Sequence, residues 1–146
     1  MKEAGTHIAV LSRQLNLYLR HELEESGLTA PELPYLAQLY ARDGLTQEEL
    51  SQTLSIDRAA TTRTMQSLER KGLVRRTADR EDKRIKRVFL TPRALAYEDR
   101  LRALQEHWTA YITQDMTEEQ SSLFARQLAH MADRARKLNQ QEVHGQ

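Results

Sequence analysis

The sequence predicts a mainly α-helical fold with one β-hairpin, and three observations lead to that class. Five glycines and three prolines among 146 residues leave room for few loops. Apolar residues recur every three or four positions through most of the chain, which is the spacing of one helix face. A single pair of β-prone runs, residues 73–77 and 87–91, encloses a highly charged stretch.

The first two helices are predicted from apolar spacing and from the residues at their ends. Residues about 6–25 form an amphipathic helix that stops before Gly27. Thr29 and Glu32 have the spacing of a capping box and open a second helix, which runs to about residue 42. Pro34 delays the regular part of this helix by a few residues.

The third and fourth helices are short and are separated by a brief turn. Thr46 and Glu49 form another capping-box pair at the start of the third helix. Asp57 caps the fourth helix, which ends at Gly72. Two helices joined in this way form a helix-turn-helix unit.

The hairpin and two more helices complete the chain. The hairpin loop has no Asn-Gly pair, so it is predicted to be longer than two residues. Thr91 followed by Pro92 starts a long helix, and Thr117 with Gln120 caps the last one. The apolar stripes of these two helices are Tyr97, Leu101, Leu104, Trp108 and Tyr111 in the first, and Phe124, Leu128, Met131, Ala135 and Leu138 in the second.

Composition bears on assembly and location. With 29% charged and 39% hydrophobic residues, the chain is lean for a self-sufficient monomer, so we expect a homodimer whose terminal helices share a core. The alternative is that these helices pack within one chain. The longest apolar runs have four residues, too few for a membrane span or a signal-peptide core, which predicts a cytoplasmic protein with no membrane partner.

The sequence contains no cysteine, so the protein is predicted to have no disulfides and no thiol-based redox sensing.

Charge is unevenly distributed along the chain. The total is only +1, but residues 57–93 hold twelve Lys and Arg against five Asp and Glu, a net +7, and the rest of the chain carries −6. A charge run is usually a solvated surface. Here the basic residues lie on two adjacent elements, the fourth helix and the hairpin, which favours a surface that binds a polyanion.

The outer face of the fourth helix has the side chains that read base edges in a major groove. Arginine donates a bidentate pair to guanine, glutamine pairs with adenine, and a methyl group contacts the methyl group of thymine. The alternative is an ordinary solvated helix face. The residues of this helix predicted to contact DNA are Arg58, Ala59, Thr62, Arg63 and Gln66.

The hairpin tip is suited to a neighbouring minor groove. Arg80, Lys83 and Arg84 fit a narrow, negative groove. The acids beside them would weaken a purely electrostatic probe, but Asp82 can hold an arginine extended by bidentate pairing. A salt-bridged surface loop is the alternative. A helix-turn-helix followed by such a hairpin predicts a winged helix-turn-helix, an α+β unit within the mainly α chain.

Two stretches resemble the MarR (multiple antibiotic resistance regulator) family of bacterial winged helix-turn-helix repressors. They are LTQEELSQTLSIDRAATTRTMQSLERKGLVRR at residues 45–76, and DREDKR at residues 79–84 with RVFLT following, and the resemblance covers nearly the whole chain. The second stretch is similar to the family's wing signature, Asp-x-Arg-Asp-x-Arg. The resemblance implies that Arg84 enters the minor groove, that Asp82 positions it and that Arg63 contacts DNA. Glu81 stands where the family often has arginine.

The resemblance also implies an organisation and a mode of action. Residues 30–91 would form the DNA-binding domain, and residues 1–29 and 92–146 the dimerisation region. The dimer would bind double-stranded DNA at a pseudo-palindromic operator and release it when a small aromatic or phenolic effector binds. The residues expected to line the effector site are Tyr18, Tyr35, Tyr40, Trp108 and Tyr111, with Arg20 and His107 as polar groups. The alternative is that these aromatic residues only pack in the core or the interface.

Other function classes find little support in the sequence. It has no glycine-rich phosphate loop, no nucleophile elbow and only scattered histidines, so we expect no enzyme, no metal site and no cofactor. The rival interpretation is a winged helix used for protein interaction or for non-specific nucleic-acid binding. Such modules usually lose the basic outer face of the fourth helix, whereas Arg58 and Arg63 are present here.

Overall fold

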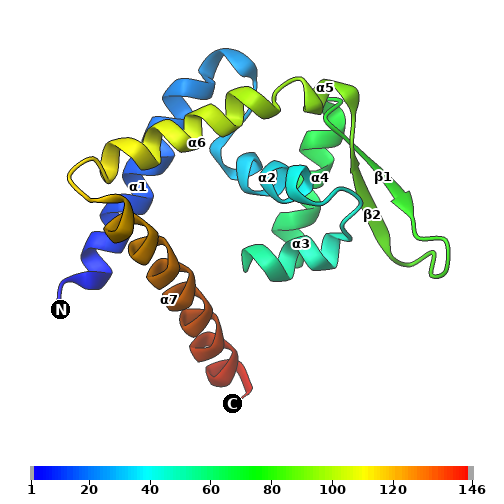
Figure 1. Ribbon diagram of the computed structural model, residues 1–146. Helices are drawn as coiled ribbons and strands as arrows, with labels where there is room; N and C mark the ends of the chain where they lie inside the picture. Colours follow the sequence, from blue (N-terminus) through cyan, green and yellow to red (C-terminus); the bar gives the residue numbers. More distant parts are fainter. Residues whose placement is uncertain (1, 145–146) are drawn as a thin grey trace. The chain divides into compact units, whose positions relative to one another are not determined.

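The computed structural model describes residues 2–144, and of residues 141–144 the backbone alone. Within these residues the backbone divides into two units, the first ending at residue 106 and the second beginning at residue 107. The elements labelled in Figure 1 and the two short 3-10 helices follow in chain order: α1 (Ala4–Leu23), η1 (Glu24–Ser26), η2 (Ala30–Glu32), α2 (Leu33–Ala41), α3 (Gln47–Leu54), α4 (Arg58–Arg70), β1 (Val74–Ala78), β2 (Lys86–Leu90), α5 (Pro92–Leu95), α6 (Glu98–Ile112) and α7 (Glu118–His144).

The helix-turn-helix formed by α3 and α4 begins at the predicted caps. The Glu49 N–H donates to Thr46 Oγ1 at 3.0 Å, and the Thr46 N–H donates to Glu49 Oε2 at 2.8 Å. Asp57 Oδ1 accepts from the Ala60 N–H at 2.7 Å and fixes the start of α4. Between the helices, Ser55 takes a left-handed conformation with φ 55°, which lets α4 leave α3 at an angle.

The sheet is the antiparallel pair β1 and β2, with Val74 opposite Leu90 and Ala78 opposite Lys86. The loop before α3 lies along the free edge of β2. The Val88 N–H donates to the Leu45 carbonyl at 2.8 Å, and the Gly44 N–H donates to the Val88 carbonyl at 3.0 Å. The hairpin is therefore attached to the helix-turn-helix through main-chain hydrogen bonds.

One hydrophobic core lies within the first unit. It collects side chains from α1, α2, α3, α4, both strands, α5 and the start of α6. Eight of its members are fully buried, and they are Leu23, Leu36, Leu39, Leu50, Met65, Leu68, Val88 and Ala94. Because α4 contributes Thr61, Met65 and Leu68 to the buried side, its opposite face is left to solvent.

Several predicted boundaries differ from the observed ones. The second helix starts as the 3-10 helix η2 before α2, as expected from Pro34. Both strands are shifted by one residue: β1 is Val74–Ala78 and β2 is Lys86–Leu90. α1 ends at Leu23, and η1 continues it to Ser26.

The single helix predicted after Thr91 is wrong, because the chain forms α5 and then α6. The Ala94 carbonyl accepts from the Tyr40 hydroxyl at 2.6 Å and from the Tyr97 N–H at 3.0 Å. These bonds end α5, since that carbonyl does not bond four residues on as in a continuous helix. Ala94 itself is fully buried.

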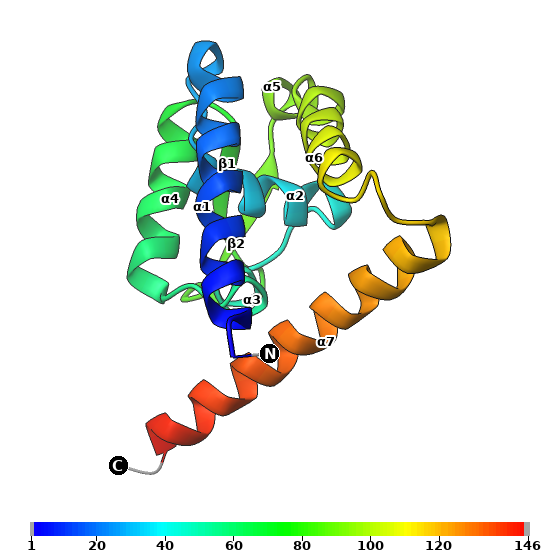
Figure 2. The same cartoon turned by 90° about the vertical axis from the view of Figure 1, so that its left-hand side faces the viewer.

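The C-terminal half of α1 packs within the first unit, as Figure 2 shows from the side. The Tyr18 hydroxyl donates to the Leu104 carbonyl at 3.3 Å, and Arg100 donates to the Glu22 carbonyl at 3.0 Å. Four apolar residues of α1 are between 41% and 57% exposed, and they are Ile8, Val10, Leu11 and Leu17. These four side chains give α1 an exposed apolar surface.

The second unit consists of the end of α6 and the 27-residue helix α7. The predicted cap is present: the Thr117 N–H donates to Gln120 Oε1 at 2.8 Å, and the Gln120 N–H donates to Thr117 Oγ1 at 3.2 Å. The apolar residues of α7 that are 41% to 58% exposed are Leu123, Leu128, Met131 and Leu138. In the described residues, no helix is long and apolar enough to span a membrane.

Candidate nucleic-acid interface

The outer face of α4 has the exposed side chains expected of a reading helix. Arg58, Ala59, Arg63 and Gln66 are exposed, and Thr62 is half-buried. The Arg58 side chain is 80% exposed and pairs with Glu48 of α3 at 2.8 Å. Arg63 forms no ion pair within the described residues. Of the two arginines on this face, one is already held by an acid and the other is available.

A tight turn shapes the tip of the hairpin. Asp79 Oδ2 accepts from the N–H groups of Glu81 and Asp82, at 3.1 and 3.2 Å. The Ile85 N–H donates to the Asp82 carbonyl at 3.0 Å, and the Asp79 N–H donates to the Ile85 carbonyl at 2.9 Å. These bonds close the loop between the strands, so the tip has a defined conformation in spite of its charge.

The predicted pair between Asp82 and an arginine is present, and the arginine is Arg84. Its Nε and Nη2 donate to the two carboxylate oxygens of Asp82, both at 3.0 Å. The hydrogen bonds from Arg84 hold the pKa of Asp82 below its ordinary value, and the same pairing raises the pKa of Arg84. The Arg84 side chain remains 90% exposed, so it extends into solvent from a fixed base. Arg80 and Lys83 are also exposed.

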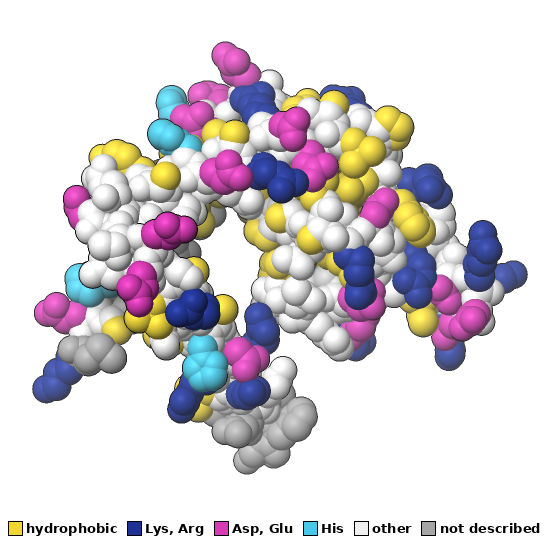
Figure 3. Space-filling model, viewed as in Figure 1, with side chains coloured by type: hydrophobic (Ala, Val, Ile, Leu, Met, Phe, Trp, Pro, Cys, Tyr) yellow, Lys and Arg dark blue, Asp and Glu magenta, His cyan; other side chains and the backbone are white. Residues whose placement is uncertain are grey.

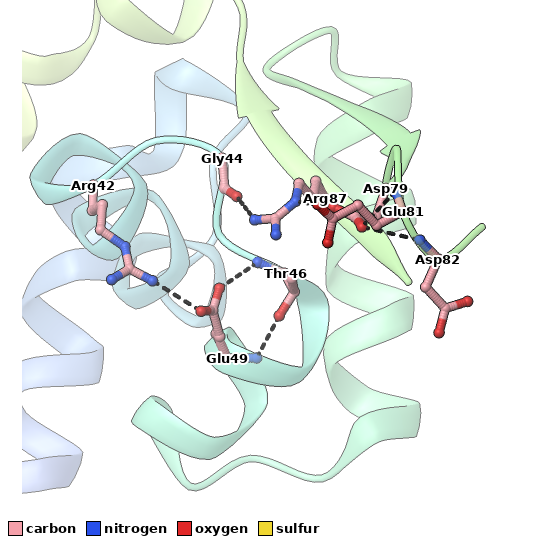
Figure 4. Close-up of polar contacts among 8 residues, drawn as sticks. All are labelled: Arg42, Gly44, Thr46, Glu49, Asp79, Glu81, Asp82 and Arg87. Atoms are coloured by element: carbon pink, nitrogen blue, oxygen red, sulfur yellow. Dashed lines mark hydrogen bonds and ion pairs between the residues drawn. The ribbon is translucent and has the colours of Figure 1, made fainter. Parts of the chain in front are cut away.

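A second arginine, Arg87, joins the tip of the hairpin to the rest of the domain, and no sequence pattern had predicted this role. Arg87 Nε donates to Asp79 Oδ1, and Nη1 donates to the Gly44 carbonyl at 3.0 Å. Figure 4 shows Arg87 between Gly44 and Asp79, with the Thr46 and Glu49 cap beside it. The hydrogen bond from Arg87 lowers the pKa of Asp79. Arg87 therefore ties the loop before α3 to the residue that organises the tip.

A cleft brings part of the predicted site together. It lies between the start of α3, α4 and the hairpin, and its lining residues are Thr46, Gln47, Glu48, Arg58, Thr61, Thr62, Arg84, Ile85 and Lys86. Arg58, Thr62 and Arg84 thus share one hollow. Arg63 and Gln66 do not line it, and Arg80 lines another hollow with Arg75 and Phe89. In Figure 3, basic and acidic side chains alternate over the hairpin.

The aromatic residues predicted to line an effector site lie in different surroundings. Tyr35 is only 1% exposed, and its hydroxyl lies 3.1 Å from Thr61 Oγ1, so it is a core residue and not the wall of an open site. Tyr18 and Tyr40 are half-buried, with their hydroxyls on main-chain carbonyls. Tyr111 is 66% exposed and belongs, with Trp108, to the second unit. Arg20 and His107 are exposed.

Tyr40 lines a small hollow between α2 and α6. Its volume is about 220 Å³, and the walls include Leu33, Leu101, Glu98 and Arg102. Burial, and then the nearby Glu98 carboxylate, raise the pKa of Tyr40 to about 12. The phenol is therefore neutral at physiological pH. Among the described residues, no group of three histidine or carboxylate side chains could hold a metal ion.

Comparison with known proteins gives consistent results. A model of the MarR family matches residues 26–85. The chain is 30% identical to a MarR transcriptional regulator from Methanosarcina mazei, and the two structures match with a TM-score of 0.88 over 94% of this chain and 99% of that one. It is also 28% identical over 120 residues to the HTH-type transcriptional regulator YybA of Bacillus subtilis, which is 82% of this chain and 80% of the relative.

One matching structure was solved with nucleic acid. It is a MarR-type protein from Listeria monocytogenes in complex with a 26mer DNA, and it matches with a TM-score of 0.89 at 24% identity, over 94% of this chain and 91% of that one. At that identity the match establishes the winged-helix fold. The matched proteins are transcriptional regulators and not enzymes.

Proposed function

Because the chain belongs to the MarR family of transcriptional regulators, we propose that it binds a pseudo-palindromic operator in double-stranded DNA as a homodimer and acts as a repressor. The observation that carries the proposal is the cleft that Arg58 and Thr62 of α4 share with Arg84 of the hairpin. A helix in the major groove and a wing in the adjacent minor groove would need these side chains on one side of the domain. The Listeria protein with the same fold is bound to DNA.

Within this proposal the predicted DNA contacts keep their roles. Arg58, Ala59, Thr62, Arg63 and Gln66 would face the major groove, and Arg80, Lys83 and Arg84 the minor groove, with Asp82 holding Arg84. Residues 30–91 would form the DNA-binding domain. The protein would work in the cytoplasm of a bacterial cell, where it meets the genome.

The dimer is proposed from the surfaces at the two ends of the chain. Apolar side chains on α1 and α7 are about half exposed, and a 27-residue helix with such a stripe gains most of its stability from packing. A second copy that supplies the same helices would cover both stripes. Residues 1–29 and 92–146 would then form the dimerisation region, with two α4 helices about 34 Å apart for successive major grooves.

The test of this function is selection of bound duplexes from a random pool at near-physiological salt. We expect enrichment of a pseudo-palindrome with half-sites about ten base pairs apart. Binding that only fades as salt rises, with no enriched sequence, would contradict the proposal. The chain would then be a non-specific nucleic-acid-binding or protein-interaction module.

A pair of substitutions tests the assigned contacts. Arg63→Ala with Arg84→Ala removes one groove-facing arginine from α4 and one from the hairpin, and both side chains are exposed. We expect loss of binding to the selected duplex, with an unchanged melting temperature and an unchanged dimer mass. Wild-type affinity in the double variant would show that these surfaces do not face DNA.

A narrower proposal concerns an effector. A small aromatic carboxylate or phenol would bind each protomer and favour a dimer whose α4 helices no longer match the operator. The hollow beside Tyr40, with Arg102 in its wall, supports a site for such a molecule. Titration with salicylate should weaken DNA binding and raise the melting temperature. If saturating salicylate and related phenols change neither, DNA release is controlled in some other way.

A further inference from the structure

A chain of side-chain hydrogen bonds joins the hairpin to the outer face of α4. Arg76 of β1 donates from Nη2 to Glu69 Oε1 at 3.1 Å and from Nε to Glu69 Oε2 at 3.3 Å. Its Nη1 donates to Gln47 Oε1 at 3.2 Å, and Gln47 Nε2 donates to Thr62 Oγ1 at 3.2 Å. Three elements, β1, α3 and α4, are thus linked through four side chains.

The direction of each bond follows from the chemistry of Arg76. A guanidinium can only donate, so the Gln47 amide must turn its oxygen toward Arg76 and its NH₂ toward Thr62. The threonine oxygen then accepts, and its hydroxyl hydrogen is left for another partner. Arg76 can fix the orientation of the Gln47 amide, because its own side chain is only 21% exposed and is paired with Glu69. The hydrogen bonds from Arg76 also lower the pKa of Glu69, which keeps that carboxylate charged.

Thr62 differs in this respect from the other threonines of α4. The Thr64 hydroxyl donates to the Ala60 carbonyl at 3.0 Å, within its own helix. The Thr61 hydroxyl is buried and lies 3.1 Å from the hydroxyl of Tyr35. Thr62 lines the cleft with Arg58 and Arg84, and its hydroxyl oxygen accepts a hydrogen bond from the Gln47 side chain.

We infer that Gln47 and Arg76 are positioning residues that make Thr62 a hydrogen-bond donor toward DNA and so set base preference at the position Thr62 faces. A donor selects base edges that present acceptors, such as guanine O6 and N7 or thymine O4. Neither positioning residue needs to touch DNA for this effect. The inference rests on the proposed function, since it concerns how an operator is read.

The decisive substitution is Gln47→Glu, which keeps the size of the side chain and reverses the bond to Thr62. A carboxylate accepts from Arg76 and also from the Thr62 hydroxyl, so the threonine oxygen is left to accept from DNA. We expect preference at one base pair to shift by about fivefold or more toward bases that present an amino group, such as cytosine or adenine. Thr62→Val, tested on single-base variants of the selected operator, identifies that base pair.

Gln52→Glu is the matched control, because Gln52 lies on α3 and donates to Glu48 instead of to Thr62. It adds the same charge, and it should lower affinity by the same factor whichever base pair stands at the position that Thr62 faces. In a Thr62→Val background the shift caused by Gln47→Glu should vanish. Gln47→Leu offers a neutral second variant, and it should reduce discrimination at the same base pair without reversing it.

The outcomes separate this inference from the function on which it rests. If the parent protein enriches no sequence, the proposed function and the inference both fail. If the parent enriches an operator but Gln47→Glu changes its base preferences no more than Gln52→Glu does, the inference alone is overturned. The same holds if Thr62→Val leaves every base preference unchanged.

Discussion

At the tip of the wing, Asp82 accepts three hydrogen bonds from Arg84, two from the guanidinium and one from the main-chain N–H. In the proposed complex with DNA, an acid at this position would oppose binding by its charge alone. Any gain from Asp82 would then come from geometry, because the pairing keeps the exposed Arg84 side chain extended.

Two substitutions distinguish geometry from charge. Asp82→Ala and Glu81→Ala each remove one negative charge from the tip, but the Glu81 side chain forms no hydrogen bond or ion pair with the described residues. We expect Glu81→Ala to leave operator affinity unchanged or slightly higher, and Asp82→Ala to lower it by about threefold or more. Fluorescence anisotropy with a labelled operator measures both. Tighter binding by Asp82→Ala would mean that only charge matters at the tip.

Glu32 is the one buried carboxylate among the described residues of the first unit, and it links α4 to η2. It is 2% exposed and accepts from Lys71 Nζ at 2.7 Å, from Ser67 Oγ at 2.8 Å and from the Thr29 N–H at 2.9 Å. Burial alone would raise the pKa of Glu32, but the bonds from Lys71, Thr29 and Ser67 outweigh it and hold the pKa below 4.5.

The lowered pKa of Glu32 predicts how stability depends on pH. The stabilisation is present above the ordinary pKa near 4.5 and is lost as the pH falls through the lower folded-state value. Glu32→Gln should cost about 2 kcal/mol of unfolding free energy at pH 7, because it removes the charge from the carboxylate that accepts both bonds from Lys71. It should also make urea unfolding less sensitive to pH below 4.5. The exposed Glu25→Gln serves as control, and equal effects of the two would contradict this role.

Hydrogen-bonded pairs in the candidate site could be predicted from the sequence only when the two residues are close together along the chain. The Asp82 and Arg84 pair could be predicted because the two residues are neighbours within one loop. The bonds of Arg87 to Gly44 and of Arg76 to Gln47 join residues 43 and 29 positions apart. No periodicity relates such residues, because the register of the hairpin against the helices decides them. A basic residue inside a strand, as Arg87 and Arg76 both are, was the only available signal.

At the scale of helices and strands, capping residues predicted the starts of helices reliably. The capping bonds of Thr46, Asp57, Thr91 and Thr117 are present as predicted, since each depends on residues within one turn. The break between α5 and α6 could not be predicted. The Ala94 carbonyl accepts a hydrogen bond from the Tyr40 hydroxyl of α2, which is far from Ala94 in the sequence. The strand boundaries were missed by one residue because neighbouring elements hold Leu73 and Thr91. The Leu73 N–H donates to the Leu68 carbonyl of α4 at 2.9 Å, and Thr91 caps α5.

Arg87 joins the tip of the hairpin to the loop before α3, so its loss should change both the conformation of the tip and DNA binding. Arg87→Gln removes the bonds to Asp79 and the Gly44 carbonyl, whereas Lys86→Gln removes the same charge from an exposed neighbour. We expect Arg87→Gln to speed amide hydrogen exchange at Asp79 and Glu81 and to lower operator affinity about tenfold. Lys86→Gln should lower affinity by less and leave exchange unchanged. Equal effects in both measurements would show that Arg87 acts only as a charge.

At the scale of the whole molecule, the terminal helices lead to a prediction about assembly. Leu128 belongs to the apolar stripe of α7, and Ala129 beside it lies on the other side of the helix. Leu128→Asp should shift the protein toward monomer in sedimentation equilibrium, while Ala129→Asp should leave it dimeric. A parent that sediments as a monomer, or two variants that behave alike, would contradict a dimer built on this stripe.

If α4 and the hairpin face DNA as proposed, the ion pairs on this surface would also affect how the protein moves through a genome. Arg58 is paired with Glu48 and Arg84 with Asp82, so two prominent cations already have counterions within their own chain. Contact with arbitrary DNA would then release few bound salt ions and give only short residence. Competing sites number about a million or more in a genome, so brief stops would shorten the search for the proposed operator. On this proposal the surface acids would speed target finding although they weaken attraction to DNA in general.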